Sequence, residues 1–169
     1  MLRAWQTVAI TLVALTMGTS FAHVLEWPAK LHYSGELYLR IQTSLYAYWG
    51  PPIVTGFVEP AAVLSVLFLA VRCRGRPVIL RLTLGAAICL LLAFPIVFFW
   101  RVAPANATFF RAVHTGILPS NWNAWRTRWE TGHAIRFVLH LIAFVLLALS
   151  LTNDRAETDA ERSLQQHHT

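Results

Sequence analysis

The sequence predicts an all-α integral membrane protein, a four-helix bundle whose longer connections are helical too. Three observations support this prediction: 56% of the 169 residues are hydrophobic, only 13% are charged, and four stretches are apolar over helical lengths. Soluble domains contain roughly 25% charged residues, so this chain has too few charges to cover a surface in water. A helix crosses the bilayer core with about 20 residues. The ranges that satisfy this length are about 5–26, 53–71, 78–103 and 132–152.

The first span lies close to the N-terminus, which leaves a signal-peptide interpretation open. Arg3, an apolar run and the small-x-small sequence at 20–22 would fit a signal peptide cleaved after Ala22. We prefer an uncleaved span, because Ser20 and His23 belong to one helical stripe that continues across the cleavage point.

The connection between the second and third spans predicts the orientation of the helices. It contains the densest group of cations, which is Arg72, Arg74, Arg76 and Arg81. Short connections rich in Lys and Arg stay in the cytoplasm, so we expect both termini there, in a bacterial inner membrane. Membrane topology also accounts for the net charge of +6. Nucleic acid is not an expected partner, because its binding needs cations clustered on a folded polar face.

The two longer connections, 27–52 and 104–131, are expected on the non-cytoplasmic side. Ser34 can cap a helix whose apolar face suits the membrane interface. That face consists of Leu37, Ile41, Leu45 and Tyr48. The pair Pro119-Ser120 predicts a helix start that runs on into the last span. Tryptophans near these connections predict an interfacial belt; they are Trp27, Trp49, Trp100, Trp122, Trp125 and Trp129.

The chain divides into one transmembrane domain, 1–152, and a cytoplasmic tail, 153–169. The tail is charged and has no apolar periodicity, which is typical of disorder. The two cysteines, Cys73 and Cys89, form no C-x-x-C motif, so thiol-disulfide chemistry is not expected.

Acidic and imidazole side chains gather at the non-cytoplasmic ends of the spans. A charge in hydrocarbon is costly unless it is paired, so such residues are candidates for a functional site. His23-x-x-Glu26 ends the first span, Glu59 lies near the start of the second, and Glu130-x-x-His133 begins the fourth. Because the helices alternate in direction, these five residues reach the same depth.

This set of side chains predicts a metal centre. Di-iron carboxylate bundles bind their metal with Glu-x-x-His motifs and further glutamates that project inward from facing helices. We therefore expect iron or another transition metal, although the set has one carboxylate fewer than that pattern. The expected ligands are His23, Glu26, Glu59, Glu130 and His133. Contacts that orient the ligands or bind the substrate are expected from Asn106, Arg126, Trp129 and Arg136.

Two other interpretations stay open, and the catalytic residues are not assigned. In the first, the protein transfers electrons through haem b, with axial ligands drawn from His23, His133 and His140. In the second, the protein is not an enzyme and its buried charges are structural. The carboxylates of Glu26, Glu59 and Glu130 would then pair with Lys30, Arg126, Arg128 and Arg136.

Four motifs carry a family resemblance. They are the run 23–31 (HVLEWPAKL), Glu59-Pro60, Pro104-x-Asn106, and Trp125-Arg126-x-Arg128-Trp129-Glu130-x-x-His133-x-x-Arg136. Together they resemble the four-helix membrane proteins called domain of unknown function 1772, a group similar to the anthrone oxygenases of polyketide pathways. The resemblance covers 1–152. It implies a membrane oxidoreductase or oxygenase that acts on a small lipophilic aromatic substrate and is surrounded by membrane lipid.

Overall fold

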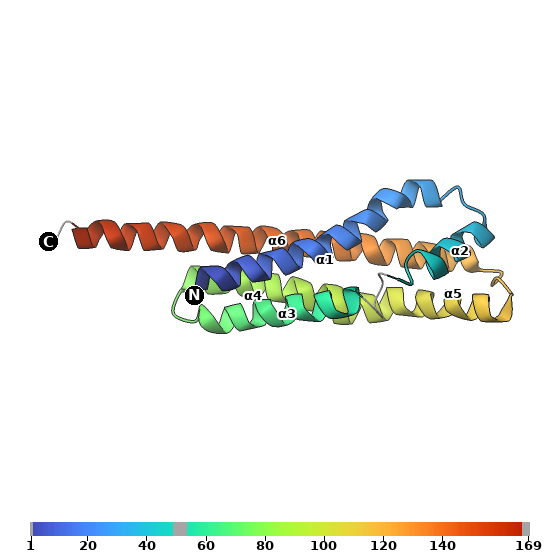
Figure 1. The fold of residues 1–169 in the computed structure, drawn as a ribbon, viewed down its shortest axis with the longest axis horizontal. Helices are drawn as coiled ribbons and strands as arrows, with labels where there is room; N and C mark the ends of the chain where they lie inside the picture. The colour runs from blue at the N-terminus through green and yellow to red at the C-terminus, as the bar shows by residue number, and fades with distance from the viewer. Residues whose placement is uncertain (1, 49–53, 167–169) are drawn as a thin grey trace.

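The computed structural model describes residues 2–48 and 54–166, with side chains as far as Asp154, and the regular structure of this part of the chain is entirely helical (Figure 1). The helices are α1 (Leu2–Lys30), α2 (Gly35–Ser44), α3 (Thr55–Arg72), α4 (Pro77–Leu91), the π-helix η1 (Leu92–Val102), α5 (Ala103–Thr115) and α6 (Trp122–Gln166). The all-α prediction is confirmed for these residues.

Within the part of the chain that the structure describes, four helical stretches are long and apolar enough to cross a membrane, as predicted. They are Leu2–Lys30, Thr55–Arg72, Pro77–Thr115 and Trp122–Asp154. The third differs from the prediction, because α4, η1 and α5 form one continuous run of 39 residues that does not end near Pro104. An α-helical proline clashes with the carbonyl four residues before it. The wider π turns of η1, which contain Pro95, relieve this clash and let the helix continue.

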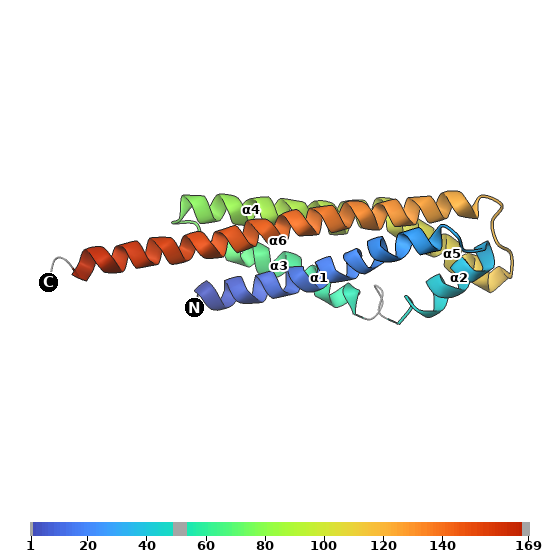
Figure 2. The same ribbon diagram turned by 90° about the horizontal axis from the view of Figure 1, so that it is seen from above.

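The long helices lie side by side, and the short helix α2 packs on α5 (Figures 1 and 2). Helix α6 contacts α1 and α4, and α3 contacts the same two helices. Both termini lie at one end of the molecule, which we call the terminal end, whereas α2 and α5 form the opposite end, the α2/α5 end. Small and branched apolar side chains fill the space between helices toward the terminal end, among them Ala9, Val13, Val66, Leu69, Ala86 and Leu147. Aromatic side chains dominate the core of the α2/α5 end.

Helix α2 begins as its sequence predicts. The Ser34 hydroxyl accepts a hydrogen bond from the Leu37 N–H at 3.2 Å. Of the predicted apolar face, Leu37, Leu45 and Tyr48 are exposed, whereas Ile41 is partly buried against the aromatic core. Tyr38 and Gln42, one helical turn apart, are buried. This arrangement leaves one face of α2 for the interior and one for the surroundings.

Helix α6 begins at Trp122, two residues after the predicted start at Ser120, and continues to Gln166. The sequence predicts a disordered tail from Asn153, whereas in the structure the helix continues into this segment. The segment after Asn153 is rich in Ala, Glu, Arg and Gln, which are strong helix formers, and they allow the helix of the last span to continue. Trp49, His167 and His168 lie outside the described residues.

Candidate functional site

A cavity of about 230 Å³ lies toward the α2/α5 end of the molecule. One water needs only about 10–15 Å³ of such space, so the cavity has room for a small organic molecule. Six residues singled out in the sequence line it: His23, Glu59, Asn106, Trp129, His133 and Arg136. Of the five residues expected at one depth, His23, Glu59 and His133 line this cavity, and Glu26 and Glu130 are not part of its lining.

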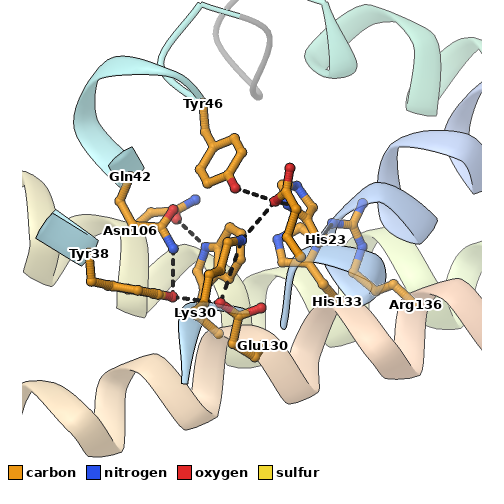
Figure 3. A network of polar contacts seen from close by, with 11 residues as sticks. His23, Lys30, Tyr38, Gln42, Tyr46, Asn106, Glu130, His133 and Arg136 are labelled. Carbon is orange, nitrogen blue, oxygen red and sulfur yellow. Dashed lines mark hydrogen bonds and ion pairs between the residues drawn. The ribbon is translucent and has the colours of Figure 1, made fainter. Parts of the chain in front are cut away.

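Two histidines from different helices meet in the cavity wall. The rings of His23 on α1 and His133 on α6 have centroids 4.1 Å apart, and both residues are less than a tenth exposed. The indole of Trp129, one helical turn before His133, packs against both rings at 4.6 and 4.2 Å. The close packing of α1 on α6 thus builds a compact group of three aromatic rings (His23 and His133 in Figure 3).

A buried ion pair joins α3 to α6 beside this histidine pair. Arg136 Nη2 donates to Glu59 Oε1, and both residues are nearly inaccessible. Arg136 Nη1 lies 3.5 Å from His133 Nδ1. Because a guanidinium can only donate, His133 Nδ1 is the acceptor in this contact, and the neutral ring carries its proton on Nε2.

A second ionic cluster, centred on Lys30, lies next to the cavity. The Lys30 ammonium is 2% exposed, 2.9 Å from Glu26 Oε2 and 3.6 Å from Glu130 Oε1. It also lies over the rings of Tyr46 and Trp129, at 4.6 and 4.7 Å from their centroids. This one cation therefore contacts two carboxylates and two aromatic rings. Of these four groups, only that of Glu26 belongs to α1.

Side chains that sequence reasoning missed complete this cluster (Figure 3). Tyr38 OH donates to Glu130 Oε1 at 3.0 Å and accepts from Gln42 Nε2 at 2.6 Å, while Tyr46 OH donates to Glu26. Burial, followed by the Glu130 charge, raises the pKa of Tyr38 well above its ordinary value. Burial, followed by the hydrogen bond to Glu26, does the same for the pKa of Tyr46. The only sequence signal for Tyr38 and Gln42 is their i, i+4 spacing on α2.

We expect these two phenols to destabilise the fold at alkaline pH. An unfolded tyrosine loses its proton near pH 10, whereas the raised pKa values keep Tyr38 and Tyr46 protonated in the folded state. Their contribution to stability is complete below about pH 10 and is lost as the pH rises towards the folded pKa values. Unfolding by sodium dodecyl sulfate in mixed micelles, followed between about pH 9 and 12, should show this fall. Tyr38→Phe and Tyr46→Phe should each reduce this fall in stability. The control Tyr48→Phe, which alters an exposed ring, should not. Equal slopes for all three variants would contradict a role of the two buried phenols.

Asn106 is held in one orientation by Trp129. The indole Nε1 donates to Asn106 Oδ1 at 2.7 Å, and because an indole can only donate, the amide oxygen must face it. The amide group of Asn106 is therefore oriented by a residue that also contacts the histidine pair.

Three other candidate residues have partners elsewhere. Arg126 Nη1 donates to the backbone carbonyls of Lys30 and Leu31, at 2.8 and 3.2 Å, and so caps the end of α1. Arg128 donates to the Trp100 carbonyl. His140 is buried against Ser20, with Nδ1 and Oγ 3.2 Å apart. The structural interpretation of the charges thus describes Lys30 and Arg136, but not Arg126 and Arg128, which bind carbonyls instead of carboxylates.

The residues do not fit the predicted metal centre. Within the described part of the chain, no group of three or more His, Cys, Asp or Glu side chains is arranged to hold a metal ion. The expected ligands Glu26 and Glu130 share Lys30, and Glu59 binds Arg136. Each carboxylate is thus paired with a cation from which a metal would have to displace it, and the rings of His23 and His133 contact each other.

The residues do not fit an axial haem pair either. The rings of His23 and His133 are in contact, so a porphyrin plane has no space between them. His140 is engaged with Ser20 and does not line the cavity. The described side chains instead form an organic cavity with imidazole, guanidinium and amide groups in its wall.

The fold and the site define a class of protein: its described residues are helical, with four helices suited to crossing a membrane and a polar-walled cavity toward one end. No family model, curated protein or solved structure matches this chain.

Proposed function

We propose that this protein is an integral membrane enzyme, an oxygenase or oxidoreductase of the anthrone-oxygenase-like type, that binds a small lipophilic aromatic substrate in the cavity. The two-sided lining of the cavity carries the proposal. Phe98, Val102 and Phe110 offer an apolar wall for a flat ring system, and His23 and His133 offer groups that can exchange protons. Such a combination of an apolar pocket with a few convergent polar groups is typical of small-molecule sites.

The helix lengths support membrane insertion and set the depth of the cavity. Helix α3 has 18 residues, about 27 Å at 1.5 Å per residue, close to the roughly 30 Å of a bilayer core. The runs Pro77–Thr115 and Trp122–Asp154 are longer, so they extend beyond the hydrocarbon at the α2/α5 end. The cavity, near the start of α3, would then lie at the membrane boundary, where a lipophilic molecule arrives from the bilayer. The basic α3–α4 connection favours a cytoplasmic terminal end.

We assign different roles to the two histidines. His23 Nδ1 lies 3.6 Å from Glu26 Oε2, so its Nε2 is the nitrogen that can accept a proton from substrate, and Glu26 stabilises the imidazolium that results. His133 Nδ1 faces Arg136. Its Nε2–H is therefore a donor for an oxyanion that develops on the substrate.

The reaction that this arrangement favours is oxidation of an activated methylene between aromatic rings. His23 removes a proton from the CH₂ group, and the resulting carbanion transfers electrons to O₂. One oxygen atom is retained as the new carbonyl and the other leaves as water, so that CH₂ and O₂ give C=O and H₂O. Apart from O₂, the residues of this chain supply every group used in these steps.

The direct test is oxygen consumption by the purified protein in lipid nanodiscs. We expect a hydroxylated anthrone to be converted to the corresponding anthraquinone, with one O₂ consumed per product. Absorbance of the quinone and an oxygen electrode measure the two quantities, and empty nanodiscs give the uncatalysed rate. A rate equal to that of the empty nanodiscs would contradict the proposal.

Removal of metal ions separates this proposal from the sequence-based alternatives. We expect EDTA to leave the rate unchanged, because the carboxylates are paired with cations and the histidines with each other. Elemental analysis and an absorbance spectrum of the same preparation complete the test. Stoichiometric iron together with a loss of activity on chelation would restore the carboxylate metal site, and a Soret band would restore haem.

One observation favours a second candidate, a membrane protein that is not an enzyme. Each carboxylate near the cavity has a cationic partner: Lys30 for Glu26 and Glu130, and Arg136 for Glu59. Such pairing is what purely structural charges require. Quenching of tryptophan fluorescence by the anthrone, without any oxygen consumption, would identify this case, because Trp129 lines the cavity.

A further inference from the structure

A second concave surface lies on the outside of the molecule, where the end of η1 meets the first turns of α6. It is an open groove of about 600 Å³, lined by Trp100, Arg101, Ala124, Thr127 and Arg128. The two helices approach closely beneath it. A Cβ added to Gly132 would lie 2.8 Å from Val102 Cγ2 and 3.2 Å from Arg101 Cβ, so glycine permits the packing that brings the groove residues together.

Two arginines give this groove an uncompensated positive charge. Neither Arg101 nor Arg128 forms an ion pair with any carboxylate of the described residues. Their positions are nevertheless well defined. Arg101 Nη2 donates to Thr131 Oγ1 at 2.7 Å, and Arg128 Nη2 donates to the Trp100 carbonyl. Two ordered guanidiniums without an acid between them are suited to an anion.

The donors of these guanidiniums are only partly used. Arg101 Nε is buried and has no hydrogen-bond partner among the described residues. Each guanidinium also lies over an indole ring, Arg101 over Trp100 and Arg128 over Trp125, both at 5.4 Å. Stacking on a ring leaves the N–H groups at the guanidinium edge available, and this edge matches the spacing of phosphate oxygens.

The depth of the groove identifies the anion. If α3 spans the hydrocarbon as proposed above, η1 and the membrane segment of α6 leave the hydrocarbon near the level of Arg101 and Arg128. Tryptophans prefer the interface between hydrocarbon and water, and Trp100 is exposed beside the groove. The anions at this depth are the phosphates of membrane lipids, whose oxygens match the guanidinium edge.

We propose that this groove binds the phosphate of an anionic phospholipid. Arg101 and Arg128 donate to the phosphate oxygens, and the indoles of Trp100 and Trp125 lie beside the part of the lipid next to its headgroup. The site depends on the membrane insertion proposed above but not on the oxygenase activity, because none of its residues lines the cavity beside the histidine pair.

Native mass spectrometry of the protein in a neutral detergent tests the site. Phosphatidylglycerol should bind at low lipid concentration and remain bound in preference to phosphatidylcholine. The Arg101→Gln/Arg128→Gln variant loses both charge-assisted contacts with the phosphate and should bind phosphatidylglycerol about 30-fold more weakly, which corresponds to about 2 kcal/mol. The matched control is Arg40→Gln/Arg111→Gln, which removes the same charge from exposed positions of α2 and α5 and should retain the affinity.

Two further measurements complete the test. Equal affinities of the groove variant and the control variant for phosphatidylglycerol would overturn the proposal. So would competition by inorganic phosphate at equal concentration, because the groove would then be a site for the free ion. Arg101→Lys/Arg128→Lys keeps the charge but not the guanidinium edge, and we expect weakened but measurable binding; it serves in place of the Gln variant if that variant does not fold. Neither measurement uses the substrate, so its outcome is distinct from that of the oxygenase assay.

Discussion

Replacing His23 by Phe should lower kcat for the proposed oxidation of a hydroxylated anthrone by about 10²- to 10⁴-fold, the usual contribution of a general base. Phe keeps the aromatic packing on His133 and Trp129 but has no nitrogen to accept the substrate proton. Because the ring volume is preserved, binding of the substrate, measured by quenching of tryptophan fluorescence, should change little. The loss should therefore appear in kcat and not in KM.

The matched control for this prediction is His32→Phe, which changes an exposed histidine outside the cavity. Glu26→Gln should lower kcat less than His23→Phe does, because Glu26 acts on the substrate only through His23. A His23→Phe protein that retains the activity of the His32→Phe control would remove His23 from the chemistry and leave the cavity without an assigned base.

The second large effect concerns stability. Glu59→Gln should lower the free energy of unfolding by about 3–5 kcal/mol, the cost of leaving one charge of a buried pair without its partner. Arg136 is 3% exposed, and its Nε has no hydrogen-bond partner among the described residues, so little else compensates its charge. Unfolding by sodium dodecyl sulfate in mixed micelles measures this change.

The double variant Glu59→Met/Arg136→Met tests the reason for that loss. Replacing both charges of a buried pair by apolar side chains of similar size is often neutral or stabilising, so the double variant should recover most of the lost stability. Glu36→Gln, on the exposed face of α2, is the control and should change the stability by less than about 0.5 kcal/mol. If the double variant is no more stable than Glu59→Gln alone, desolvation of an unpaired charge is not the cause.

Several features of the fold could be predicted because they depend on local sequence. The four apolar stretches and the Ser34 cap of α2 belong to this group, since hydropathy and capping act within one helix. The polar lining of the cavity was predictable for a related reason. His23, Glu59 and His133 are costly in an apolar helix, and their positions along antiparallel helices indicate a common depth.

Other features could not be predicted, because one pattern of sequence allows several different partners. The spacing Glu-x-x-His suggested ligands of a metal, but Lys30 and Arg136 lie close enough to take the same carboxylates. The pair Pro104-x-Asn106 suggested a helix end, yet π turns carry the helix past it. Tyr38 and Tyr46 were missed, because they reach the site only through the way the segment after α1 folds back.

The sequence by itself thus determined that the chain is helical, that four stretches suit a membrane, and that the scarce acids and histidines gather at one end. These properties follow from the composition and periodicity of single helices. Only the tertiary structure decided which charge meets which, because that choice depends on helix rotation and on distances of a few ångströms between segments remote in sequence. In low dielectric such distances determine the energies of charged groups, and here they place Lys30 between Glu26 and Glu130 and leave the two histidines in contact at the cavity wall.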